Sequence, residues 1–155
     1  MQEYLNDAKE ELKRLDHSIY VSLKYTRTVD VFMNIISSMV DAYDCMLDAV
    51  LEFAREKNLI IDIPSSPREK GELIKETFDD EVIRDNVNLY FLLRKLSKSV
   101  PERANEYRRN VTMTAYIDNR KEIVNIDIAT EYYHFQREFL DYIHSLIVNS
   151  TDNSD

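Results

Sequence analysis

Residues 28–57, TVDVFMNIISSMVDAYDCMLDAVLEFAREK, decide the fold. Polar residues follow one side of this stretch, among them Asp30, Asp41, Asp44 and Asp48. Apolar residues recur on the other side at steps of three and four, which is the period of an amphipathic α-helix. A helix of about 30 residues is roughly 45 Å long, which favours an elongated bundle over a sphere. The apolar positions are Val29, Phe32, Met33, Ile36, Val40, Tyr43, Leu47, Val50, Leu51 and Ala54.

The segments next to this stretch are also predicted to be helical. Residues 2–23 carry a second apolar stripe, and the chain is expected to break at 25–28, with Thr26 or Thr28 as the N-cap of the long helix. After a connector at 59–64, the pattern Ser66-Pro67-Arg68-Glu69 is that of a capping box with proline in the first turn. It predicts a short helix ending near Phe78.

The C-terminal half completes a predicted all-α fold, an elongated up-and-down helical bundle of five to six helices. Residues 1–148 are expected to form one domain. Its remaining elements are a helix capped by Asp79 or Asp80, a helix from Pro101 to about Met113, a polar loop at 118–122, a helix from Ile128 to about Val148 capped by Asp127, and a disordered tail at 149–155.

Composition excludes several classes of function. The chain has one glycine, Gly71, which argues against hairpin-rich β folds and excludes a glycine-rich phosphate loop. Its one cysteine, Cys45, excludes an intrachain disulfide. The net charge of −9 repels phosphate backbones on average. The N-terminus lacks a signal peptide pattern, and no stretch reaches 18 apolar residues, so we expect a cytoplasmic protein without membrane contact.

Positive charge is nevertheless concentrated in one part of the chain. This basic segment has two interpretations, a solvated and salt-bridged surface, or a site for an anion or an RNA backbone. Its residues are Arg94, Lys95, Lys98, Arg103, Arg108, Arg109, Arg120 and Lys121.

Within the basic segment, residues 109–116 read RNVTMTAY. This resembles the signature of the HEPN superfamily, R-N-x-x-x-H-x-Y, with Arg109, Asn110 and Tyr116 in place and Thr114 where the family has histidine. The resemblance implies a dimeric helical bundle in which the motifs of two protomers form a metal-independent ribonuclease site. A threonine hydroxyl cannot act as the base that imidazole supplies near neutral pH. The departure at Thr114 therefore leaves a binding role, with Arg109 as a phosphate ligand.

Other candidate residues have weaker patterns. Glu131 and His134 are three residues apart on one predicted helix, as are Asp141 and His144. Each pair could therefore hold one metal ion. Both pairs lie on the same helix, whereas a dinuclear site needs several helices, so surface or capping roles are preferred and no metal or cofactor is predicted. Cys45 lies beside aspartates in mid-helix, which disfavours a reactive thiolate.

Three functions remain open from the sequence. The first is a non-enzymatic helical binding protein, a homodimer whose Arg108 and Arg109 bind an anionic or protein partner. The second is an HEPN-like RNA-binding protein or variant ribonuclease, and the third is a ferritin-like metal bundle. No catalytic residue is assigned, and the binding candidates are Arg108, Arg109, Asn110, Thr114 and Tyr116. Dimerisation is inferred from apolar residues beside the main stripes, namely Ile35, Met39, Met46, Tyr132 and Tyr133.

Overall fold

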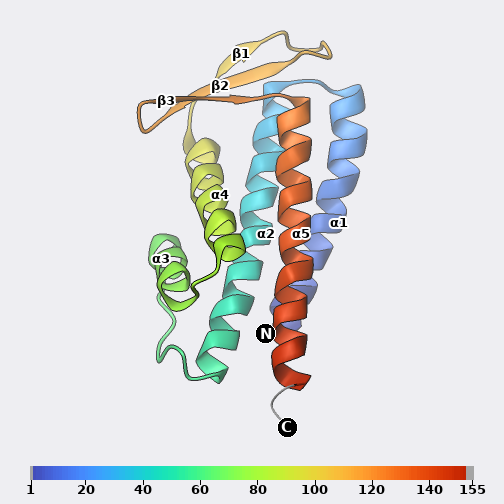
Figure 1. The fold of residues 1–155 in the computed structure, drawn as a ribbon. Helices are drawn as coiled ribbons and strands as arrows, with labels where there is room; N and C mark the ends of the chain where they lie inside the picture. The colour runs from blue at the N-terminus through green and yellow to red at the C-terminus, as the bar shows by residue number, and fades with distance from the viewer. Residues whose placement is uncertain (1, 153–155) are drawn as a thin grey trace.

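The computed structural model describes residues 2–152, in which five helices form the predicted bundle and a small sheet, which was not predicted, is added to it (Figure 1). In chain order the elements are α1 (Gln2–Tyr25), α2 (Val29–Glu56), α3 (Pro67–Thr77), α4 (Glu81–Lys98), β1 (Glu102–Ala104), β2 (Thr112–Ile117), β3 (Arg120–Val124) and α5 (Ile126–Asp152).

The four long helices run alternately up and down, and α3 packs beside α2 and α4 (Figure 1). The antiparallel sheet, in the order β1-β2-β3, lies across one end of the bundle. Helix α2 is central and contacts α1, α3, α4 and α5. It is the most apolar helix because it is covered from several sides.

Side chains fix the starts of three helices. Thr28 Oγ1 accepts from the amide of Val31 at 3.3 Å, and Ser66 Oγ accepts from that of Glu69 at 3.1 Å. Asp80 Oδ1 accepts from the amide of Ile83 at 3.0 Å and is the cap of α4. Each oxygen satisfies an amide that has no acceptor within its own helix. The expected breaks and caps at these three positions are confirmed.

The helix predicted from Pro101 to Met113 is wrong, because this segment forms β1, a loop and the start of β2. Asn105 and Tyr107 have φ values of 57° and 68°, which a right-handed helix does not allow. In β2 the alternate residues Met113 and Ala115 are buried against the bundle. Buried and outward-facing residues alternate here with a period of two, which is the pattern of a strand and not of a helix.

The expected polar loop at 118–122 is also wrong, since only Asp118 and Asn119 form the turn between β2 and β3. Their φ values are 50° and 66°. Aspartate and asparagine tolerate this left-handed conformation better than most residues, so a tight hairpin forms without glycine. Scarcity of glycine is therefore a poor argument against a hairpin in this chain.

Helix α5 starts earlier and ends later than predicted. Asn125, in place of Asp127, caps it, with Oδ1 2.9 Å from the amide nitrogen of Ile128. The helix continues to Asp152, so it includes residues 149–152 of the expected tail, while residues 153–155 lie outside the described part of the chain.

Two aspartates assigned to the solvated side of the long helix are half-buried. Asp48 binds Lys70 of α3 at 2.8 Å, and Asp44 accepts a hydrogen bond from Tyr90 of α4. Burial raises the pKa of Asp44, although the Tyr90 hydroxyl and the charge of Arg94 act in the opposite direction. The part of the acidic side of α2 that carries Asp44 and Asp48 therefore contacts α3 and α4.

Candidate anion-binding surface

The motif residues lie on β2 and in the loop before it. Thr112, Thr114 and Tyr116 alternate with the buried Met113 and Ala115, so they occupy the outward face of the sheet. Tyr116 is 61% exposed. The motif thus spans a loop and a strand, in place of the helix that the sequence predicted up to Met113.

The loop at 105–111 is attached to the junction between α1 and α2. The amide of Tyr107 donates to the carbonyl oxygen of Arg27 at 2.6 Å, and Glu106 Oε1 accepts from the amide of Val29 at 3.1 Å. Arg103 reinforces this attachment through an ion pair with Asp30 at 2.7 Å. These contacts hold the loop at a defined place on the bundle, although the loop and the α1–α2 junction are far apart in the sequence.

The basic side chains of this region differ in how they are compensated. Arg103 pairs with Asp30 and, at 3.1 Å, with Glu106. Arg108 and Arg109 are exposed and form no ion pair with any described residue. Arg108 and Arg109 are therefore the cations of this loop that no internal carboxylate compensates.

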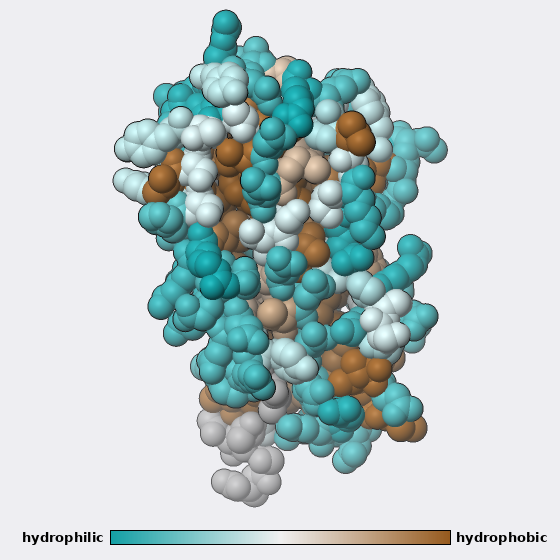
Figure 2. All heavy atoms as spheres, turned by 180° about the vertical axis from the view of Figure 1, so that it is seen from behind, coloured by the Kyte–Doolittle hydropathy of each residue, from teal (hydrophilic) through white to brown (hydrophobic). Residues whose placement is uncertain are grey.

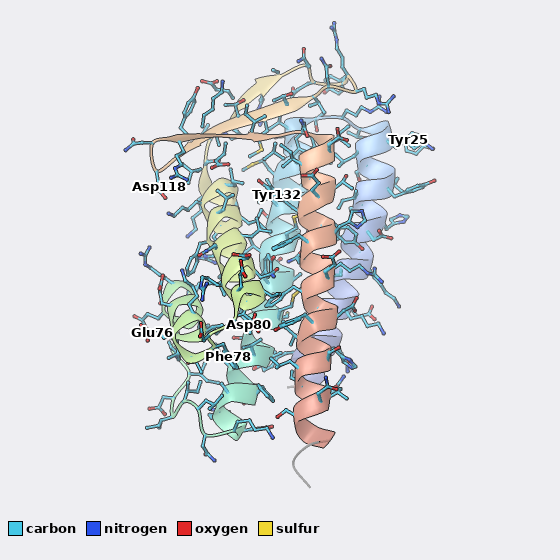
Figure 3. All side chains as sticks on the ribbon, viewed as in Figure 1. Tyr25, Glu76, Phe78, Asp80, Asp118 and Tyr132 are labelled. Carbon is cyan, nitrogen blue, oxygen red and sulfur yellow. The ribbon has the colours of Figure 1, made fainter. Side chains whose placement is uncertain are left out.

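Exposed aromatic rings lie at the same end of the molecule as these two arginines. Tyr107 is 77% exposed beside Arg108, and Tyr116 pairs across the sheet with Lys121. The adjoining end of α1 carries an exposed Tyr25, whose position at that end is visible in Figure 3. Lys24 Nζ lies 5.6 Å from the ring centre of Tyr25. The sheet end of the molecule combines cations with open aromatic faces.

A shallow cavity of about 470 Å³ connects the motif to the start of α5. It is lined by Arg109, Asn110, Thr112, Asn125, Ile126 and Asp127. Arg109 and Asn110 are therefore brought together with Thr112, whereas Tyr116 lies further along the strand. The carboxylate of Asp127 partly offsets the positive potential of Arg109 in this cavity.

The basic segment does not form one surface. Arg94, Lys95 and Lys98 lie on α4 and line a different cavity, together with Arg68 from α3. Arg68 was not among the predicted binding residues. The spacing of Phe91, Arg94, Lys95 and Lys98 indicates one face of α4. No local pattern connects Arg68 to that face, because the contact depends on how α3 packs on α4.

The other chemical candidates remain separate. Glu131, His134, Asp141 and His144 are exposed on α5. Among residues 2–152 no group of three or more histidine, cysteine, aspartate or glutamate side chains is placed to hold a metal ion. Burial and then the nearby charge of Asp7 raise the pKa of Cys45 to about 11, so its thiol is protonated at neutral pH.

Most of the apolar residues from which a dimer was predicted lie in the core of the monomer. Ile35, Met39 and Met46 are buried within the monomer, as is Tyr133. Apolar residues spread widely around these two helices because α2 is central in the bundle and α5 packs in it. Exposed apolar residues occur elsewhere, in the connector between α2 and α3, which lies at the lower right of Figure 2. There Leu59 is 54% exposed and Ile61 is 87% exposed.

No helix in the described part of the chain has the length and hydropathy needed to cross a membrane. Comparison with protein-family models, with curated proteins and with solved structures gave no match to this chain.

Proposed function

We propose that the protein is a non-enzymatic binding protein that holds single-stranded RNA at the sheet end of its helical bundle. The observation that carries this proposal is the pair Arg108 and Arg109, exposed and without a carboxylate partner among the described residues, beside the exposed ring of Tyr107, with the exposed ring of Tyr116 further along β2.

This combination suits a single strand because two kinds of contact act together. Arginine binds phosphate oxygens through its planar guanidinium, and unpaired bases stack on aromatic rings. The net charge of −9 opposes binding only over the screening distance, about 8 Å at physiological ionic strength. A local basic patch can therefore bind RNA on an acidic protein.

Binding is preferred to cleavage because of Thr114. The resemblance to the HEPN signature supports a nucleic acid ligand, but a threonine at the histidine position provides no group that titrates near neutral pH. Phosphodiester cleavage needs a base for the ribose hydroxyl and charge stabilisation at phosphorus. Arg109 can meet the second need, and Thr114 cannot meet the first.

Fluorescence anisotropy with a labelled oligouridine tests the proposal. We expect Arg108→Gln/Arg109→Gln to weaken binding about tenfold or more, because two charge-assisted contacts are lost. The dependence of log K on log salt should become shallower by about 1.4, at roughly 0.7 per phosphate contact with a single strand.

Lys13→Gln/Arg14→Gln is the matched control, since it also removes two adjacent exposed cations but lies on α1. We expect it to change binding little. Absence of salt-dependent binding, or equal weakening by both double variants, would refute the proposed surface. Loss of intact RNA that depends on Arg109 would instead favour the ribonuclease alternative.

A homodimer is the second part of the proposal, now supported by the apolar connector. Leu59 is 54% exposed and Ile61 is 87% exposed, so the connector offers two apolar side chains that a second copy of the chain could cover. Light scattering at micromolar concentration should give twice the mass of 18.4 kDa. Ile61→Asp should shift the equilibrium toward monomer, while a monomeric mass for the unmodified chain would contradict this part.

A further inference from the structure

The cavity between α3 and α4 has an unusual lining for an acidic protein. Its volume is about 360 Å³, and it is lined by Ser66, Pro67, Arg68, Phe91, Arg94, Lys95 and Lys98. Four of these side chains are cations, and none is a carboxylate. The volume falls at the lower end of the range for small-molecule pockets.

Internal partners compensate only half of these cations. Lys95 forms an ion pair with Asp118 at the tip of the β2–β3 hairpin, labelled in Figure 3. Arg94 is attracted by the half-buried Asp44 and lies 5.8 Å from the ring centre of Tyr90. Arg68 and Lys98 have no ion pair with any residue in the described range, so two positive charges face the cavity uncompensated.

The first turn of α3 adds a backbone donor beside these cations. Pro67 has no amide hydrogen, and the amides of Glu69 and Lys70 are bonded to Ser66. The amide of Arg68 has no acceptor in residues 2–152. An N–H at the start of a helix favours an anion, so it complements the charged side chains.

The position of α3 is fixed by packing as well as by charge. A Cβ atom on Gly71 would be 2.5 Å from Cζ of Phe91, so the absence of a side chain lets the Phe91 ring pack against α3. Lys70 ties α3 to Asp48 of α2 at 2.8 Å. Arg68 is therefore held opposite the cations of α4 by two rigid helices, which reduces the ordering cost of binding.

From this arrangement we infer that the cavity between α3 and α4 binds the phosphate group of a small phosphate monoester. Arg68, Lys98 and the amide of Arg68 are the free donors, and Arg94 completes the positive field. In the ligand-free protein the carboxylate of Asp118 in the hairpin forms an ion pair with Lys95. It therefore competes with the phosphate for this cation. This site is independent of the proposed RNA surface, which uses Arg108 and Arg109 at the sheet end.

Isothermal titration of the full chain tests the site with inorganic phosphate, adenosine 5′-monophosphate and adenosine. We expect the two phosphate compounds to bind and adenosine to give no heat. Equal affinity for both phosphates means that only the phosphate group is recognised, whereas tighter binding of the nucleotide means that the cavity also seats its organic part. Binding of adenosine alone, or of none of the three, would overturn the inference.

Variants locate the site and separate it from the RNA surface. Arg68→Gln/Lys98→Gln should weaken phosphate binding about tenfold or more, while Lys13→Gln/Arg14→Gln and Arg108→Gln/Arg109→Gln should leave it unchanged. Asp118→Asn should tighten binding by up to about fivefold, since it removes the competing carboxylate. Equal weakening by all three double variants would show a general charge effect and refute the site. Melting curves confirm that each variant is folded.

Discussion

The hydroxyl of Tyr43 on α2 donates a hydrogen bond of 2.7 Å to Oδ1 of Asn86 on α4 inside the core. The Nδ2 of Asn86 donates in turn to the carbonyl oxygen of Val82 at 2.8 Å. Burial holds the pKa of Tyr43 well above its ordinary value, so the hydroxyl keeps the proton that it donates. This pair aligns α4, which forms one wall of the α3–α4 cavity, with the central helix α2.

Tyr43→Phe should destabilise the protein by about 1–3 kcal/mol, because it leaves the buried Oδ1 of Asn86 without a donor. Urea unfolding followed by circular dichroism measures the change. Tyr20→Phe is the matched control, since Tyr20 is exposed, and should stay within about 0.5 kcal/mol. Equal effects of the two variants would show that the Tyr43–Asn86 bond contributes nothing net.

Gly71→Ala should lower the free energy of unfolding even though alanine is the better helix former. The new methyl group meets Phe91 Cζ at 2.5 Å and Val87 Cγ1 at 3.1 Å, and such overpacking costs about 1–3 kcal/mol. In a Phe91→Ala background the clash with the ring is removed. There the same change should stabilise by up to about 1 kcal/mol, from helix propensity. A double-mutant cycle by urea unfolding gives both values, and identical effects in the two backgrounds would contradict the contact.

Asn119 should tolerate glycine but not alanine. Its φ of 66° costs an ordinary L-residue roughly 1–2 kcal/mol, whereas glycine adopts it freely. We expect Asn119→Ala to lower the melting temperature and Asn119→Gly to leave it equal or higher. Scanning calorimetry checks the pair, and a more stable alanine variant would contradict the hairpin turn.

Cys45 should react slowly with thiol reagents at neutral pH. Its pKa of about 11, raised by burial from an ordinary value near 9.0, leaves little thiolate below pH 9. Because the folded pKa is the higher one, this thiol favours the folded state below about pH 9 and loses that contribution as pH rises through about 11. Alkylation rates measured against pH should show an inflection near 11 when folded and near 9 in urea. Rapid alkylation at pH 7 would disprove the shift.

The sequence determined the helices because their signals are local. The apolar period of residues 29–56 and the caps Thr28, Ser66 and Asp80 act within a few residues of one another, and the structure confirms them. The segment at 101–124 carried no such signal, since its strands are short and are stabilised by pairing with each other and by burying Met113 and Val124 on the bundle. The hairpin was not predicted from glycine content, because Asp118 and Asn119 adopt the left-handed conformation of the turn without glycine.

Tertiary structure alone decided where the charges meet. Residue types identified a basic segment, but in the fold its cations lie in different places. Arg103 pairs with Asp30, whereas Arg108 and Arg109 are open at the sheet end. Lys98 lies opposite Arg68. Arg68 and Lys98 are 30 positions apart along the chain, and their proximity depends on how α3 packs on α4 through Gly71. Helix formation follows from local backbone and side-chain preferences, whereas a binding surface follows from packing between distant segments, which periodicity does not encode.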